Sequence, residues 1–163
     1  MGHESIVYGY IEGAPHHPEL RLHRLNAAVI KRLPIEDEWP PLTRQMFCLP
    51  CGRPAQGTYR SQIIHFGGSF KSIEWEWEEW LEKFEALLQR LYWWSATVHL
   101  KTELSVGDHS YTWQANNDAI SRLYSLPPQP ITRWEFMGGP RGWAWDTKLP
   151  KPPAQVPLDS GHS

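Results

Sequence analysis

The sequence of this 163-residue chain predicts a single α+β domain, in which a mainly antiparallel sheet carries one long helix on a face and one or two shorter helices. Three observations favour this class. Short runs rich in β-branched and aromatic residues stand in neighbouring pairs, which is typical of hairpins. One long segment has apolar residues at helical spacing. With 40% hydrophobic residues, the chain is long enough for one core and too short for two.

The first part of the chain predicts a strand, a helix and a long loop. Residues 5–12, "SIVYGYIE", alternate loosely and predict an opening strand that ends at Gly13. Residues 18–33 predict a helix that stops before a proline, because four apolar residues recur at nearly helical spacing, namely Leu22, Leu25, Val29 and Leu33. Residues 34–60 contain too many prolines and glycines for regular structure. A loop longer than about 15 residues in a compact domain is either functional or wrongly assigned, and we favour a functional loop here.

The middle of the chain predicts a hairpin followed by the long helix. Residues 61–73, "SQIIHFGGSFKSI", indicate a strand, a turn at Gly67 and Gly68, and a return strand. Ser72 is suited to cap a helix N-terminus, and glutamates follow it in the first turn, where they complement the helix dipole. We therefore expect the long helix to run from Ser72 to about Trp93.

The last part of the chain predicts two strands, a short helix and a final strand. Residues 96–104 and 109–115 indicate antiparallel strands joined around Gly107 and Asp108. Asn116 or Asn117 is expected to cap a helix over "DAISRLYSL", and "ITRWEFMGG" supplies the last strand. We place the domain at residues 1–145. Residues 146–163 are rich in proline and poor in large apolar residues, and we expect a mostly disordered tail.

The helical segment 72–94, "SIEWEWEEWLEKFEALLQRLYWW", has two distinct faces at 100° per residue. One stripe predicts the core face, with Trp77, Leu81, Phe84, Leu88 and Leu91 in its centre and Trp80 and Leu87 on its flank. The opposite face carries Glu78, Glu79, Glu82, Lys83 and Glu85. Trp75 projects into the middle of this charged face, about 160° from Trp77. Either it meets a partner, or the preceding loop covers it, or the helix begins one turn later.

Acidic residues are concentrated in two short pieces of the chain. Nine of the eighteen lie either in the helical segment, which has six glutamates, or in the loop at Glu36, Asp37 and Glu38. If the loop lies against the helix, these pieces form one negative patch that suits a basic protein partner. The predicted partner-binding residues are Trp75, Glu78, Glu79, Glu82, Glu36, Asp37, Glu38 and Trp39.

The overall composition argues against several other partners. The chain has sixteen basic and eighteen acidic residues, a formal charge of −2, and so no positive field that would hold nucleic acid or an anionic membrane. The start "MGHESIVYGYIEG" lacks the basic and apolar regions of a secretory signal, and no apolar run approaches the length of a membrane span. We expect a cytoplasmic protein. Ten tryptophans suit both a core and an interface.

Motifs for chemistry are weak. Cys48 and Cys51 form "CLPC", which has the spacing of a redox dithiol or half a zinc site. A small metal-binding or redox enzyme is therefore one alternative, with His16 and His17 as further candidate ligands. Since Gly52, Arg53 and Pro54 prevent a helix directly after the motif, and since a lone CxxC is weakly specific, we expect no metal, no cofactor and no small-molecule substrate. No phosphate-binding loop or hydrolase motif is present.

One strand could also carry acid–base groups. His99, Lys101 and Glu103 would share one face of their strand, and His65 and Gly67 one face of another. A trio of this kind suits proton transfer, but it is more often simply a solvated sheet face. The sequence therefore predicts a binding protein and not an enzyme.

The stretch "FGGSFKSIEWEWEEWLEKFEALLQRLYWWSATVHLKTEL", together with "YTWQA" and the opening "HESIVYGYIEGA", resembles bacterial polymorphic-toxin immunity proteins, and among them the group known as immunity protein 52. The likeness covers most of residues 3–142. It implies a cytosolic inhibitor that blocks the active site of a cognate toxin, often one delivered by a contact-dependent or type VI secretion system. The matching motif positions are Trp75, Trp77, Trp80 and Phe84.

These immunity proteins share no catalytic residues, so the resemblance implies stoichiometric inhibition. A toxin directed at nucleic acid, such as a nuclease, has a basic cleft, and an acidic inhibitor can imitate the phosphate backbone there. A second alternative is an adaptor or chaperone that binds a secreted effector away from its active site.

Overall fold

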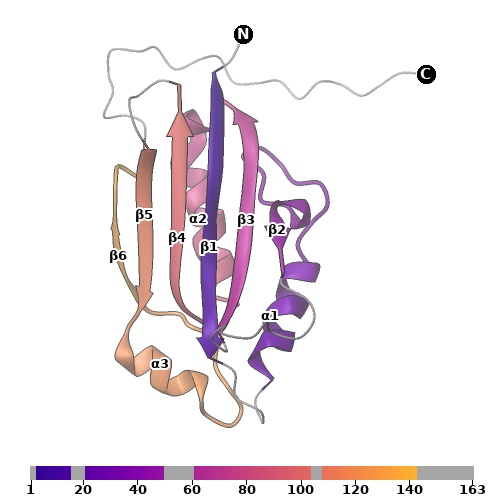
Figure 1. Ribbon diagram of the computed structural model, residues 1–163, viewed down its shortest axis with the longest axis vertical. Coiled ribbons are helices and arrows are strands. Elements are labelled where there is room, and N and C mark those ends of the chain that lie inside the picture. Colours follow the sequence, from indigo (N-terminus) through magenta and orange to yellow (C-terminus); the bar gives the residue numbers. More distant parts are fainter. Residues whose placement is uncertain (1–2, 16–20, 50–60, 104–107, 143–163) are drawn as a thin grey trace, which may run out of the picture.

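The computed structural model describes residues 3–15, 21–49, 61–103 and 108–142, and these form one six-stranded antiparallel sheet with three α-helices. The strand order is β2-β3-β1-β4-β5-β6 (Figure 1). In chain order the elements are β1 (Glu4–Pro15), α1 (Leu22–Lys31), the 3-10 turn η1 (Arg44–Met46), β2 (Phe47–Cys48), β3 (Ser61–Lys71), the 3-10 turn η2 (Ile73–Glu76), α2 (Trp77–Leu88), β4 (Trp93–Thr102), β5 (Asp108–Ala115), α3 (Asn117–Leu123) and β6 (Trp134–Gly138).

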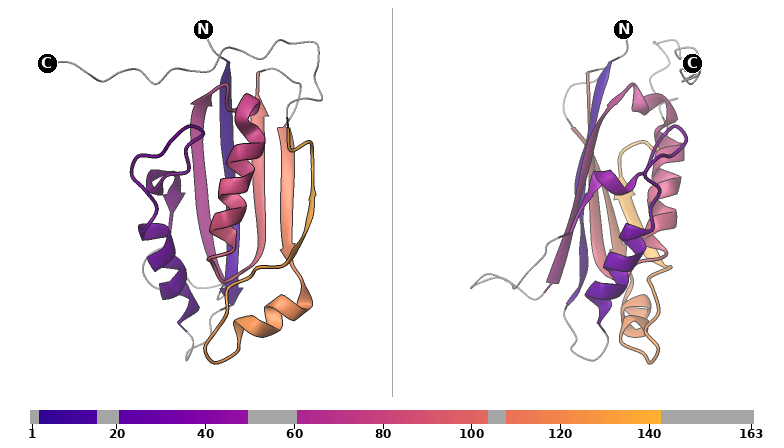
Figure 2. Two further views of the ribbon diagram at one scale, coloured as in Figure 1. Left: turned by 180° about the vertical axis from the view of Figure 1, so that it is seen from behind. Right: turned by 90° about the vertical axis from the view of Figure 1, so that its right-hand side faces the viewer.

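The predicted α+β class is confirmed. α2 lies along one face of the sheet, and α1 and α3 lie on the same side (Figure 2). β1 is central and pairs with β3 on one side and β4 on the other, with Val7 opposite both Gly68 and Leu100. Side chains alternate along β1, so Val7 and Ile11 are fully buried under the helices, whereas Tyr8 and Tyr10 point to the open face and are 39% and 40% exposed.

The predicted turn at Gly67 and Gly68 is wrong, because both glycines lie inside β3. β3 is one continuous strand that pairs with β1 from Ser61 to Lys71. A Cβ atom on Gly68 would lie 2.8 Å from the ring of Phe70, and one on Gly67 would lie 3.2 Å from the carbonyl oxygen of Val7. These glycines therefore permit close approach within the sheet, which is the other common role of glycine in a strand.

The predicted start of the long helix at Ser72 is also wrong. Ser72 has a left-handed conformation (φ 58°, ψ 40°) and makes no side-chain cap. Its hydroxyl oxygen instead accepts a hydrogen bond from the backbone N–H of His3 at 3.1 Å, which ties the end of β3 to the start of β1. The chain then makes the 3-10 turn η2, so that the α-helix begins at Trp77 and ends at Leu88, before the predicted end near Trp93.

α1 is shorter than predicted and is rotated relative to the expected apolar stripe. It spans Leu22–Lys31, and its buried residues are Leu22, Asn26 and Ile30, whereas Leu25 is 37% exposed. Asn26 is buried because its amide satisfies both backbone groups of Tyr92: its Nδ2 donates to the carbonyl oxygen at 2.9 Å, and its Oδ1 accepts from the N–H at 2.8 Å. A hydrophobic pattern does not register a buried amide of this kind.

The core face of α2 agrees with the sequence prediction. All seven predicted apolar residues are buried: Trp77, Trp80, Leu81, Phe84, Leu87, Leu88 and Leu91. The rings of Trp77 and Trp80 stack with their centroids 5.1 Å apart, and the ring of Phe84 packs on that of Trp113 in β5, also with centroids 5.1 Å apart. This aromatic cluster attaches the helix to the middle of the sheet.

The C-terminal elements follow the prediction. β4 and β5 are antiparallel, and Asn116 caps α3 by accepting a hydrogen bond from the N–H of Ala119 at 2.8 Å. The predicted turn residue Gly107 and the predicted tail, 146–163, lie outside the described residues.

Candidate protein interaction surface

The acidic part of the long loop is attached directly to α2. The Lys83 ammonium group donates three hydrogen bonds to the loop, to Oδ2 of Asp37 at 3.0 Å and to the backbone carbonyl oxygens of Glu38 at 2.9 Å and Pro40 at 2.8 Å. One side chain of the helix thus holds three residues of the loop, Asp37, Glu38 and Pro40. The assumption that loop and helix lie side by side is confirmed for this segment.

Two tryptophans extend the contact between the loop and the helix. Nε1 of Trp80 donates to the carbonyl oxygen of Pro41 at 3.0 Å, so this buried indole has a partner in the loop. Nε1 of Trp39 lies 3.4 Å from Oε2 of Glu76, and the Trp39 ring meets Phe70 edge-on at 6.2 Å. Trp39 is nevertheless 40% exposed, so part of an anchored indole faces solvent.

Asp37 is held in its charged form. Partial burial alone would raise the pKa of this carboxyl group, but the backbone N–H of Leu42, which donates to Oδ2 at 2.9 Å, and the adjacent Lys83 ammonium outweigh burial and lower the pKa below its ordinary value. Asp37 therefore organises the loop, and its charge is neutralised by Lys83.

The remaining carboxylates of this region define the acidic surface, which consists of Glu36, Glu38, Glu76, Glu78, Glu79 and Glu82. Glu76 is half-buried and the other five are exposed. Among the described residues, no lysine or arginine forms an ion pair with any of the six; the two pairs found in this region join Lys83 to Asp37 and Arg141 to Glu85. Within the described part of the chain, no basic side chain therefore neutralises this surface.

Two glutamates of the helical segment do not contribute to this surface. Glu74 is fully buried and accepts a hydrogen bond from the hydroxyl group of Ser5. Glu85 accepts from Nε1 of Trp113 at 3.0 Å and pairs with Arg141, so its charge is neutralised. A count of acidic residues in the sequence cannot separate these structural carboxylates from the exposed ones.

Trp75 does not lie on the outer face of α2. It belongs to η2, is half-buried, and packs against the hydrophobic core. The helical wheel placed it among exposed carboxylates because it extended the α-helix back to Ser72, and the alternative of a later helix start is the correct one. Trp39 is the partly exposed indole beside the acidic surface, and a contact of Trp75 with a partner stays a prediction.

Lys83 is the residue that sequence reasoning undervalued. The helical wheel places it among the glutamates of the charged face, yet in the structure it anchors the loop. One signal was available: Lys83 is the sole basic residue between positions 72 and 89, where it stands among six glutamates. Its partners in the loop could not be identified, because the contact spans more than 40 positions of sequence.

The residues considered for chemistry lie elsewhere. Cys48 is exposed on β2, while Cys51, His16 and His17 lie outside the described residues. Within the described residues, no three His, Cys, Asp or Glu side chains are grouped closely enough to hold a metal ion. None of the helices in that part of the chain is both long and apolar enough to cross a membrane.

The predicted histidine strand face is part of the open face of the sheet. Nδ1 of His99 lies 2.9 Å from the hydroxyl oxygen of Ser110, and its ring is tilted by 30° against that of Tyr8, with centroids 4.9 Å apart. Tyr8 in turn donates to Asp108 at 2.6 Å, which raises the pKa of the Tyr8 hydroxyl group. These contacts hold the side chains to one another along the sheet.

Comparison of the chain with protein-family models, with curated proteins and with solved structures finds no match in any of the three.

Proposed function

We propose that this protein is a bacterial immunity factor that binds a cognate toxin with a basic surface and neutralises it by occluding its active site. The observation that carries the proposal is the acidic surface, in which a loop fixed by Lys83 places an anchored, partly exposed tryptophan beside unneutralised carboxylates. The resemblance of the sequence to polymorphic-toxin immunity proteins supports the same class.

The chemistry of the acidic surface suits fast and tight binding to a basic protein. The carboxylates of the acidic surface create a negative potential that accelerates encounter with a positively charged partner. A partly exposed indole that is already held in place loses little conformational freedom on binding, and tryptophan is the residue type most enriched in interface hot spots. A basic nuclease cleft, which normally receives phosphates, is the kind of site that such a surface would fill.

The proposal includes the cellular setting. The protein acts in the cytoplasm of the toxin-producing cell, forms a stoichiometric complex, and has no catalytic role of its own. A type VI or contact-dependent secretion system is the proposed route by which the toxin arrives from neighbouring cells.

Co-expression with the toxin encoded beside this gene tests the proposal. The variant Trp39→Ala/Glu79→Lys/Glu82→Lys alters only residues that are exposed, so we expect it to fold, to lose growth protection, and to bind the toxin at least about a hundredfold more weakly in calorimetry. The matched control is Tyr10→Ala/Glu103→Lys/Glu135→Lys, which removes a similarly exposed aromatic ring and two carboxylates elsewhere. This control should protect fully.

Two outcomes would contradict the proposal. If the acidic-surface variant keeps wild-type affinity while the control loses it, the partner binds another face. If the wild-type protein binds the effector without inhibiting it, the protein is an adaptor or chaperone.

A further inference from the structure

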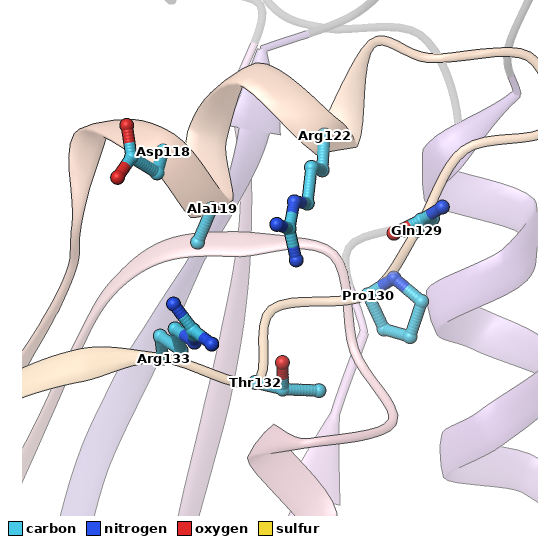
Figure 3. Close-up of a pocket in the computed structure, with 7 residues that line it drawn as sticks. All are labelled: Asp118, Ala119, Arg122, Gln129, Pro130, Thr132 and Arg133. Atoms are coloured by element: carbon cyan, nitrogen blue, oxygen red, sulfur yellow. The ribbon is translucent and has the colours of Figure 1, made fainter.

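A pocket of about 300 Å³ lies between α3 and the segment that leads into β6 (Figure 3). Arg122 enters it from α3, and Arg133 enters it from the facing segment. Its volume is near the lower limit of pockets that hold small ligands. None of its lining residues belongs to the acidic surface.

The two guanidinium groups point into this one hollow from opposite sides (Figure 3). Within the described part of the chain, neither forms an ion pair, although Asp118 stands on the same rim. Two cations that face the same small space repel each other, and an anion between them would remove that repulsion. Arginine is also the side chain whose planar fork best matches anionic oxygens.

The walls of the pocket are fixed by backbone hydrogen bonds. The N–H of Gln129 donates to the carbonyl oxygen of Arg122 at 3.1 Å, and the N–H of Asn116 donates to that of Arg133 at 3.4 Å. Between them, Ile131 is fully buried and its N–H donates to the carbonyl oxygen of Leu91 at 3.1 Å. Both arginines therefore extend from anchored backbone, which lowers the entropic cost of binding a ligand.

We infer that this pocket binds the phosphate group of a small phosphomonoester. A phosphomonoester carries a charge of about −1.5 to −2 and three terminal oxygens, which matches two guanidinium groups better than a monocarboxylate, whose two oxygens one arginine can satisfy. The Thr132 hydroxyl group and the Gln129 amide line the same space and can donate further hydrogen bonds. Ala119 and Pro130 supply apolar wall for the organic part of the ligand.

Titration of the isolated, isotope-labelled protein with ribose 5-phosphate, observed by NMR, tests the inference. We expect saturable shifts confined to the amides of residues 118–123, 129 and 131–134. Arg122→Gln and Arg133→Gln should each weaken binding by about tenfold or more, and the double variant should abolish it. Arg44→Gln, which removes an exposed arginine at η1, is the matched control and should bind as the wild type does.

A parallel titration with inorganic phosphate separates the two sources of the anion. Tighter binding of ribose 5-phosphate supports an ester ligand, whereas equal or tighter binding of inorganic phosphate overturns the ester assignment. Shifts that do not saturate at several millimolar ligand, or an equal loss in Arg44→Gln, would show diffuse attraction to surface charge and overturn the site itself. The measurement involves no toxin, so its result is independent of the proposed immunity function.

Discussion

At the scale of single residues, Lys83 explains how a proline-rich loop becomes a defined surface. Its ammonium group satisfies all three of its donors on the loop, and the side chain is only partly exposed. A contact of this kind is stronger than an isolated surface ion pair, because two of its acceptors are backbone carbonyl groups fixed relative to each other. The charge of Lys83 thus has a structural role. Because Lys83 neutralises Asp37, this carboxylate does not add to the negative charge of the acidic surface.

Replacement of Lys83 by methionine should release the loop without unfolding the sheet. The loss of three charge-assisted hydrogen bonds is expected to destabilise the local structure by about 1 to 3 kcal/mol. Hydrogen exchange should then accelerate at the amide of Leu42, which donates to Asp37, and stay unchanged at Val98 in β4. Lys101→Met on the open face is the control. Unchanged exchange at Leu42 would show that the loop is held by other contacts.

The lowered pKa of Asp37 predicts how the loop responds to acid. A carboxyl group whose pKa is lower in the folded state stabilises that state above its unfolded pKa of about 4, and this contribution is lost as the pH falls through the lower folded value. The exchange protection factor of the Leu42 amide should therefore be constant from neutral pH to about pH 5 and fall only below about pH 4. Asp37→Asn should remove this transition. Loss of protection with a midpoint above pH 5 would contradict the assignment.

At the scale of elements, the two faces of α2 have different roles, although its sequence is one tryptophan-rich run. Its inner face packs Trp77, Trp80 and Phe84 on the sheet, and its outer face carries exposed glutamates. The link between the two is Trp80, whose ring is in the core while its N–H holds Pro41 of the loop. The helix therefore positions the acidic surface relative to the sheet.

Trp77→Ala should destabilise the whole domain. Trp77 is 1% exposed and its ring stacks on that of Trp80. The ring centroids of Trp77 and Tyr111 are 5.5 Å apart, so truncation of Trp77 leaves a large cavity between helix and sheet. We expect a loss of about 3 to 5 kcal/mol in the free energy of unfolding, measured by urea denaturation. Trp39→Ala, which removes a partly exposed ring, should cost clearly less. Equal effects of the two substitutions would show that the core of the helix interface lies elsewhere.

At the scale of the whole molecule, helices cover one face of the sheet, and none of the described helices lies on the other face (Figure 2). The acidic surface is formed by residues of α2, η2 and the loop before β2, whereas the arginine pocket lies beside α3 (Figure 3). These two features carry opposite charge on separate parts of one domain. The near-neutral formal charge of −2 therefore conceals a strong local separation of charge.

Much of the fold could be predicted because it depends on local periodicity. The apolar stripe of α2, the alternation in β1, and the Asn116 cap are all determined by residues within a few positions of one another. The predictions that failed share a different cause. Gly67 leaves room for the carbonyl oxygen of Val7, Ser72 bonds to His3, and Asn26 bonds to Tyr92. Each of these partners is far away along the sequence, so local patterns do not reveal the role of the residue.

In the candidate site, too, local patterns predict some features and contacts between distant segments decide the others. The sequence by itself determined that acidic residues and tryptophans are concentrated in two segments, since composition is a local property. Only the tertiary structure decided which of them face solvent: it buried Glu74, paired Glu85 with Arg141, placed Trp75 against the core, and fixed Trp39 beside Glu76. It also brought Arg122 and Arg133 to one pocket. Burial and ion pairing depend on contacts between distant segments, which residue spacing along one chain does not encode.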